Sequence, residues 1–393
     1  MGIFSGSKKK GKLVLVFNIR SSSVEGALFW AQSSGIPKII FSVQEPVIIE
    51  DKIGIDRLLF LTIQSLEIVV KKICMAGLGV PEQIFCVLSS PWHVSQTRII
   101  NLKKNTPFVF TVKLADSLVQ KEINLFKEEH LTKYANVDNS IRTIELKNIK
   151  TILNGYETSK PLNQKAKELE MVIFISISEE RVLKNIEKTI AKHFYLKQIQ
   201  FSSFVMASFA TVRDMYTQQE NFLLVDIGGE VTDISMIKKN ILRESISFPL
   251  GLNFIIRGVA SAFSYSLSEA KSLISLFQDG HATESVEKKL GPVIGKLKIE
   301  WLKKFQESLA NLSNDISVPA TIYLAVDQKM ADFFSETIKN EQFNQYTLTE
   351  SKFQVIFLGP KIFHGLVVFD RNIIRDPFLI IDSIYINRFL INK

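Results

Sequence analysis

Residues 222–236 read Phe222-Leu-Leu-Val-Asp-Ile-Gly-Gly-Glu-Val-Thr-Asp-Ile-Ser-Met236, and this segment determines how the rest of the chain is interpreted. Leu223 to Val225 form a short apolar run typical of a buried strand, and Asp226 ends it. Gly228-Gly229 permit a tight turn that residues with a Cβ would resist, and β-forming residues resume at Ile234. The pattern therefore predicts two strands joined by a glycine turn.

Such a turn has two interpretations. A glycine turn between strands presents backbone N–H groups in a concave nest that suits a phosphate. Asp226, Thr232 and Asp233 would then hold a metal-bound water and orient the turn. Alternatively, the segment is an ordinary β-hairpin whose corner aspartate is satisfied by nearby backbone groups. The segment alone leaves both interpretations open.

The segment resembles the second phosphate loop of the actin-like ATPase superfamily, which is written D-I-G-G-G-T-T-D. Here it stands as Asp226-Ile227-Gly228-Gly229-Glu230-Val231-Thr232-Asp233. The following residues, Phe248 to Ala260, are similar to the run P-x-G-G-N-x-I-T-x-D-I-A of the bacterial FtsA and PilM families. The resemblance implies an α/β, actin-like (ribonuclease H-like) fold of duplicated domains with a small α+β inserted subdomain.

The resemblance also implies a division of the chain. We expect a basic flexible arm, a first actin-like half interrupted by the inserted subdomain, and a second actin-like half. The corresponding boundaries are 1–12 for the arm, 13–92 and 169–215 for the first half, 93–168 for the insert, and 216–393 for the second half.

Composition limits the classes of function. The 393 residues are 46% hydrophobic, which supports a substantial core. No apolar run approaches the ~20 residues of a membrane-spanning helix, and we see no signal peptide. Cys74 and Cys86 lack metal-ligand spacing, which favours a reduced cytoplasmic compartment.

The net charge of +8 can reflect an anionic partner, such as nucleic acid or anionic lipid, or simply solubility. Nucleic acid is disfavoured because the chain has no zinc-finger spacing and no RNA-binding aromatic signature. Peripheral contact with an anionic membrane is an alternative, through Lys8, Lys9, Lys10 and Lys12 or through the apolar tail 377–393. Burial of that tail against the core is the competing expectation.

Asn18 to Leu28 follow an apolar strand at Leu13 to Phe17 and resemble the superfamily's first phosphate loop, D-I-G-S-S-S-V-K. The strand–turn–strand pattern of that loop is kept, but the residues that would contact the metal and the phosphate are replaced. Asn18 replaces the aspartate that would organise the metal's water shell, Arg20 replaces a glycine, and Glu25 replaces a lysine or glutamine.

The nucleoside side is altered too. A strand at Gln354 to Phe357 leads into a segment that stands at the place of the adenosine loop, G-G-G-x-x-x-x-G. Gly359 and Gly365 are kept there, whereas Pro360 and Lys361 replace glycines. On the expected helix 267–276, with Ser268 as a possible cap, Lys271 and Ile274 replace the Glu and Lys that would reach the nucleoside.

The residues that would contact ATP, if the site survives, follow from the resemblance. They are Asn18, Ser21, Ser22, Ser23, Asp226, Gly228, Gly229, Thr232, Asp233, Gly359 and Gly365. Of these, Asp226 would also be the residue that interacts with Mg²⁺. Glu230 opposes this, because a carboxylate ~4 Å from a phosphate costs on the order of 4 kcal/mol at an effective dielectric near 20. Arg20 could partly offset this cost by pairing with the phosphate, or it could pair with Glu230 itself and fill the site without a nucleotide. We expect no catalysis and no bound cofactor.

The function we expect is that of a degenerate actin-fold scaffold. Similar to FtsA, it would link cytoplasmic protein partners to the inner face of a bacterial membrane in cell division. The alternative is a PilM-like cytoplasmic component of type IV pilus assembly. In either role it would act through protein contacts and possible self-association. An alternative of another class is an ATP-binding, nucleotide-switched polymerising ATPase that uses Asp226, Thr232 and Asp233.

Overall fold

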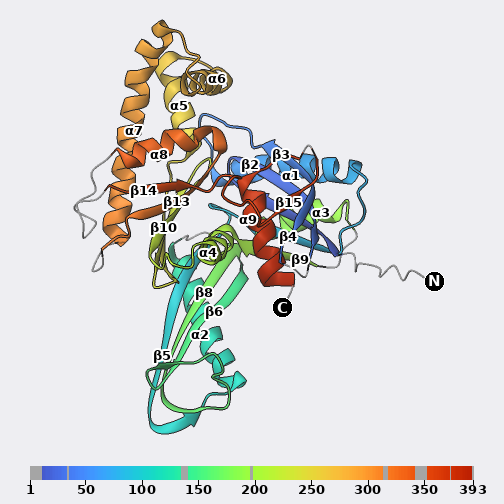
Figure 1. Ribbon diagram of the computed structural model, residues 1–393, viewed down its shortest axis with the longest axis vertical. Helices are drawn as coiled ribbons and strands as arrows, with labels where there is room; N and C mark the ends of the chain where they lie inside the picture. Colours follow the sequence, from blue (N-terminus) through green and yellow to red (C-terminus); the bar gives the residue numbers. More distant parts are fainter. Residues whose placement is uncertain are drawn as a thin grey trace, which may run out of the picture.

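Two α/β halves and a projecting sheet make up the molecule, as Figure 1 shows. The computed structural model describes residues 11–32, 35–133, 140–194, 198–312, 317–340, 352–371 and 373–391. This arrangement confirms the predicted α/β class with duplicated halves and an inserted subdomain. Of the four lysines near the N-terminus, Lys12 is already the first residue of a strand, and the other three lie outside the described residues.

The first half is built on a six-stranded sheet of order β15-β3-β2-β1-β4-β9. Its strands are β1 (Lys12–Ile19), β2 (Ser23–Ala31), β3 (Lys38–Pro46), β4 (Gln83–Leu88), β9 (Ile199–Ser203) and β15 (Val368–Phe369). β1 and β2 form an antiparallel hairpin, and β4 and β9 are added in parallel. The hairpin turn is the predicted first phosphate loop.

Alternation along β1 decides what its two faces bury. Leu13, Leu15 and Phe17 pack in the core with α1 (Ile55–Met75) and α3 (Glu180–Ala191). The even positions, among them Val14 and Val16, pack on the other side, in the core that holds α4 and α9. Those two helices span Phe204–Met215 and Pro377–Tyr385. Asn18 is also even, so it points toward α9.

The second half repeats the plan with a five-stranded sheet of order β12-β11-β10-β13-β14. Its strands are β10 (Phe222–Ile227), β11 (Thr232–Lys238), β12 (Ile241–Phe248), β13 (Thr321–Val326) and β14 (Gln354–Phe357). Its helices are α5 (Leu252–Phe263), α6 (Leu267–Gln278), α7 (Glu284–Leu312), the short 3₁₀ helix η1 (Gln328–Met330) and α8 (Ala331–Lys339). The predicted glycine turn joins β10 to β11.

The inserted subdomain is a four-stranded antiparallel sheet of order β5-β8-β6-β7, with helix α2 against it. Its elements are β5 (Val94–Val109), α2 (Val112–Lys133), β6 (Ile141–Leu153), β7 (Tyr156–Glu157) and β8 (Lys165–Glu179). β8 pairs with β5 and β6 along its whole length, so this sheet continues to Glu179, past the predicted boundary at 168. The apolar strand expected at 171–177 is the part of β8 that lies nearest the main body of the molecule.

A buried carboxylate fastens the insert to the body. Glu145, on β6, accepts hydrogen bonds from the Ser203 amide at 3.0 Å and the Ser203 hydroxyl at 2.8 Å. The Tyr385 hydroxyl donates to its other oxygen at 2.5 Å. Strand β6, the start of α4 and the end of α9 therefore meet at one residue.

Several local predictions were right and one was wrong. The Asn154-Gly155 turn has positive φ at both residues, 51° and 85°, as that dipeptide indicated. Helix α6 begins at Leu267, but its cap is Ser266 rather than Ser268, because Ser266 and Glu269 form a reciprocal capping box. In the part of the chain that is described, no helix has the length and apolar character needed to cross a membrane.

Candidate functional site

The turn after β1 and the turn after β10 are in direct contact. The Glu230 amide donates a hydrogen bond to Ser21 Oγ at 3.0 Å. A Cβ placed on Gly229 would lie 2.8 Å from the carbonyl oxygen of Ser21, so no residue but glycine fits there. The two predicted phosphate loops therefore pack against each other.

The N-terminus of α5 is also occupied. The first N–H groups of a helix are natural donors to an anion. Here the amide of Leu252 donates to the Gly228 carbonyl at 2.9 Å, and the amide of Asn253 donates to the Gly229 carbonyl at 2.8 Å. These donors therefore serve the glycine turn itself.

Glu230 is held by its own half of the molecule. Arg257, on α5, donates to both carboxylate oxygens of Glu230 at 2.7 Å, and Asn253 Nδ2 adds a third hydrogen bond at 2.7 Å. Arg257 Nε also donates to the carbonyl of Glu50 in the first half, at 2.8 Å. This set of four residues, which we call the Glu230 clasp, joins the second glycine turn to both halves. The suggested pairing of Glu230 with Arg20 is wrong.

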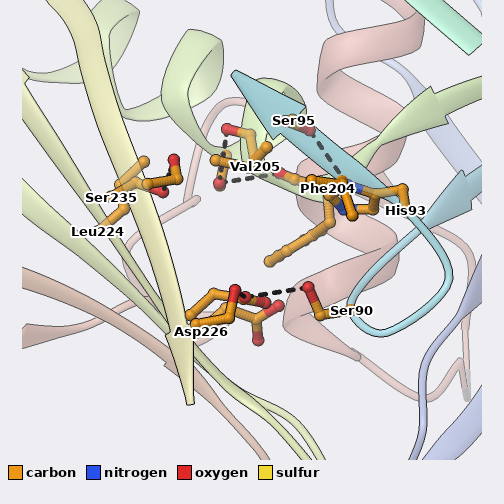
Figure 2. A pocket seen from close by; sticks show the side chains of 13 residues that line it. Ser90, His93, Ser95, Phe204, Val205, Leu224, Asp226 and Ser235 are labelled. Atoms are coloured by element: carbon orange, nitrogen blue, oxygen red, sulfur yellow. Dashed lines mark hydrogen bonds between the residues drawn. The ribbon is translucent and has the colours of Figure 1, made fainter. Parts of the chain in front are cut away.

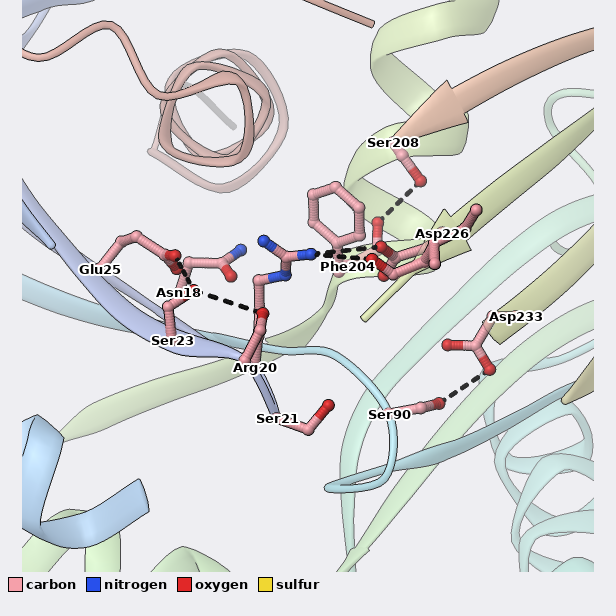
Figure 3. A network of polar contacts seen from close by, with 12 residues as sticks. Asn18, Arg20, Ser21, Ser23, Glu25, Ser90, Phe204, Ser208, Asp226 and Asp233 are labelled. Atoms are coloured by element: carbon pink, nitrogen blue, oxygen red, sulfur yellow. Dashed lines mark hydrogen bonds and ion pairs between the residues drawn. The ribbon is translucent and has the colours of Figure 1, made fainter. Parts of the chain in front are cut away.

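The Arg20 side chain instead points toward Asp226, between the two loops and α9 (Figure 3). Its side chain is 1% exposed, and its Nη2 lies 3.9 Å from Asp226 Oδ1 and 3.3 Å from the Ile227 carbonyl. The guanidinium lies 3.4 Å from the centroid of the Phe378 ring. A stacked and paired guanidinium of this kind is a packed structural group.

Two buried carboxyl groups, those of Glu25 and Asp382, and the half-buried one of Asp376 lie around Arg20 at the β1–β2 hairpin. Asn18 Nδ2 donates to Asp382 Oδ2 at 2.7 Å, while Glu25 accepts from Ser23 and from Gln44 Nε2, the latter at 3.1 Å. Burial raises the pKa of Glu25 to about 8, with Asp376 adding repulsion and Arg20 opposing. Burial likewise raises the pKa of Asp376 and that of Asp382.

Asp226 and Asp233 lie opposite each other on β10 and β11. Burial raises the pKa of Asp226 to about 6 against the opposing charge of Arg20. Burial and repulsion from Asp226 raise the pKa of Asp233 to about 7, and Ser90 Oγ donates to Asp233 at 2.9 Å. Among the described residues, no three His, Cys, Asp or Glu side chains converge to hold a metal ion.

Thr232, the third polar residue predicted at this turn, is part of the core packing. Its hydroxyl donates to the Leu250 carbonyl at 2.7 Å and accepts from Trp301 Nε1 at 3.3 Å. Trp301 is fully buried on α7 and stacks on Phe305. The hydroxyl therefore connects the turn to α7 and is not free for a water shell.

A small cavity of about 100 Å³ lies beside the aspartate pair, as Figure 2 shows. It is lined by Asp226, Asp233, Ser90 and His93, together with Phe204 at the start of α4. Burial lowers the pKa of His93 to about 4, so this ring is neutral at physiological pH. The cavity is well below the ~300–1,000 Å³ of ordinary ligand pockets and has room for about three waters.

The predicted adenosine loop follows β14, at the same sheet edge as the glycine turn because β10, β13 and β14 are parallel. Gly359 is buried, and a Cβ added there would lie 2.5 Å from the Phe357 ring. Phe363 is fully buried in the core that contains α9. On α6, Lys271 is exposed and Ile274 is buried in the second-half core. The glycine at position 359 is therefore explained by its close packing against the Phe357 ring.

The C-terminal tail packs against the body. Every residue of α9 is buried, and a π-helical turn, η2 (Ile386–Ile391), follows it. Helix α9 packs on α4, β1 and β2. The apolar side chains of 377–385 are therefore not available to a membrane, which corrects that alternative.

The structure thus brings together four of the predicted residues: Ser21, Asp226, Gly228 and Gly229. Asn18 and Ser23 lie nearby and bond to the carboxyl groups of Asp382 and Glu25. Ser22 lies beside Ser23 at the start of β2, where its carbonyl accepts from the Val47 amide at 2.9 Å. Gly365 is exposed, beyond the buried Phe363, with a φ of 83°. Sequence reasoning missed the residues that complete the site, namely Arg257, Asn253, Phe378 and Asp382. The available signal was the run 248–260 already singled out, which contains both Asn253 and Arg257.

Together these features define the class of the molecule: it has the fold of the actin-like ATPase superfamily. Among solved structures it is similar to PilM in the PilM–PilN type IV pilus biogenesis complex, with a TM-score of 0.62, 11% identity, and coverage of 95% of this chain and 97% of that one. The ethanolamine utilization protein EutJ from Carboxydothermus hydrogenoformans matches with a TM-score of 0.43, 11% identity, and coverage of 95% and 88%. An actin-like ATPase-fold protein of unknown function from Bacteroides thetaiotaomicron has a TM-score of 0.37, 9% identity, and coverage of 91% and 94%. No family model and no curated protein sequence matches the chain.

Proposed function

We propose that this chain is an actin-fold scaffold of the PilM kind, which acts by binding other proteins and does not hydrolyse ATP. The observation that carries the proposal is the Glu230 clasp, which places a paired carboxylate in the turn where the superfamily binds phosphate. The similarity in fold to PilM favours the pilus-assembly alternative over a division role. PilM itself was solved with PilN, and a comparable cytoplasmic partner at the inner face of the membrane is our proposal for this chain.

ATP with Mg²⁺ is the cofactor that the fold implies, and the residues here do not fit it. Several N–H donors at the place of the phosphate already have acceptors. The Glu230 amide donates to Ser21 Oγ, and the first amides of α5 donate to the carbonyls of Gly228 and Gly229. Bringing a triphosphate toward Glu230 would place like charges together in a partly buried setting. We therefore propose that this chain acts without a bound nucleotide.

The insert supplies a surface suited to a scaffold. It projects from the body (Figure 1) and is fixed there by Glu145. Several of its large apolar side chains are exposed, and exposed apolar groups are typical of protein–protein interfaces where they form one patch. They are Ile99, Val109, Val112, Leu125, Leu146, Tyr156 and Leu162.

An assay of phosphate release tests the absence of hydrolysis. Purified chain with ATP and Mg²⁺ should release phosphate no faster than the Asp226→Asn variant, because the aspartate that would organise a metal is paired with Arg20. The two proteins differ by one oxygen-to-nitrogen exchange and serve as matched samples. Turnover that exceeds background in the unaltered chain and disappears in Asp226→Asn would establish an ATPase and refute the scaffold proposal.

A further inference from the structure

The edge of the first-half sheet is open along β3. Strand β15 pairs with β3 only at Lys38 and Ile39. From Ile40 to Gln44, β3 has no strand partner on that side within the described part of the chain. Proteins usually protect such an edge with charged residues or proline. The five residues Ile40-Phe41-Ser42-Val43-Gln44 include neither.

An apolar groove of about 500 Å³ runs along this open edge. It lies between β3, the C-terminal end of α1 and the segment around Ile374. Met75 is 85% exposed and Ile374 is 58% exposed, although both are apolar. Ser42 Oγ donates to the Ile374 carbonyl at 2.8 Å, which fixes the far wall of the groove.

Lysines line or flank the groove, and two arginines flank its Ile374 wall in the sequence. Lys38 is paired with Asp370 at 2.9 Å, and Lys72 is paired with Glu45 at 2.6 Å. Arg375 adjoins Ile374 in the sequence, is exposed, and lies over the Phe369 ring at 5.1 Å from its centroid. It has no carboxylate partner among the residues described. Arg371, also exposed, has none there either. A carboxylate on an occupant would complement these two arginines.

We propose that the β3 edge accepts an extended segment of a partner protein as an added strand. The segment would carry small apolar residues at alternate positions, which enter the groove, and an acidic residue toward Arg375. Backbone hydrogen bonds supply affinity in this mode, and the groove supplies selectivity for alternate side chains. A second copy of this chain is a poorer occupant, because two-fold pairing of the edges would bring two sets of these arginines together. The inference holds whether or not the chain binds ATP.

A synthetic peptide tests the proposal with the full chain. The probe is fluorescein-labelled Glu-Val-Ser-Val-Ser-Val-Glu, and binding is followed by fluorescence anisotropy. N–H groups of alternate residues point to opposite edges of a strand. One peptide N-methylated at its valines and one N-methylated at its serines therefore block opposite edges. We expect binding with a Kd below about 100 µM, a loss of at least about tenfold with one methylated peptide, and little change with the other.

Variants of the chain supply the matched controls. Ile374→Glu and Met75→Glu should each weaken binding at least about tenfold. Val80→Glu, which changes an apolar residue that is 77% exposed outside the groove, should not. No binding at 1 mM peptide (roughly −4 kcal/mol), or an equal response to both methylated peptides, would overturn the proposal. A dimer of the unaltered chain that Ile374→Glu abolishes would overturn it too, since it would assign the edge to self-pairing.

Discussion

Replacing Arg20 with methionine should lower the free energy of unfolding by about 3 to 5 kcal/mol at pH 8, since it removes one partner of a buried charge network. Arg20 is 1% exposed and is the cation whose charge opposes the raised pKa values of Glu25, Asp226, Asp376 and Asp382. Without it, the buried carboxyl groups of Glu25 and Asp382 and the half-buried ones of Asp226 and Asp376 have no compensating positive charge.

The cost of this substitution should depend on pH. A carboxyl group whose pKa is raised by folding favours the folded state when protonated, so its contribution is lost as pH rises through the folded value. For Glu25 the window runs from 4.5 to about 8, and for Asp226 from 3.8 to about 6. Arg20 stabilises the ionised forms, so Arg20→Met should cost much less at pH 5 than at pH 8.

Urea unfolding of both proteins at the two pH values measures this difference. The matched control is Lys71→Met, which removes a cation that is 54% exposed and paired only with Glu67. Its effect should stay within about 1 kcal/mol at either pH. An Arg20→Met cost that is equal at pH 5 and pH 8 would contradict the proposed role of Arg20.

Trp301→Ala should lower the free energy of unfolding by about 3 to 5 kcal/mol, as expected for removal of a large buried aromatic side chain. Trp301 is fully buried, stacks on Phe305 at 5.1 Å, and contacts the rings of Phe248 and Phe334. It also donates to Thr232, so its loss should loosen the turn that follows Gly229.

Trp301→Phe separates packing from hydrogen bonding. It removes the bond to Thr232 and part of the ring volume while keeping the remaining apolar contact, so the loss should be smaller than for Trp301→Ala, with about 0.5 to 1.5 kcal/mol of it due to the hydrogen bond. Thermal and urea unfolding followed by circular dichroism measure both variants. A loss below 1 kcal/mol for Trp301→Ala would show that α7 is not packed on this hairpin as described.

The frame of the fold was predictable because its signals are local. Alternating apolar residues and glycine turns place β1, β2, β10 and β11, and the Asn154-Gly155 turn follows from its two residue types. The long strands of the insert were less clear. Near the tip, β5 carries the polar run 103–106 and β8 begins with several charged residues, while the last part of β8 reads as a separate buried strand.

The chemistry of the site was only partly predictable because its partners are distant in sequence. That Glu230 stands at a glycine position of the second loop could be read from the motif. That Arg257 holds it could not, because the two residues are 27 positions apart and meet only through the orientation of α5. Asn18 and Asp382 are 364 positions apart. Arg20 was assigned the wrong carboxylate, because no local pattern indicates that α9 returns to β1.

Calorimetric titration with ATP and Mg²⁺ is the measurement on which the scaffold account depends, performed on the unaltered chain beside Glu230→Gly. We expect no binding to the unaltered chain, because Glu230 and its partners Arg257 and Asn253 occupy the turn. In Glu230→Gly, Arg257 is released toward the loop, and weak binding should appear. Micromolar binding of ATP by the unaltered chain would contradict the account and favour a nucleotide-switched protein.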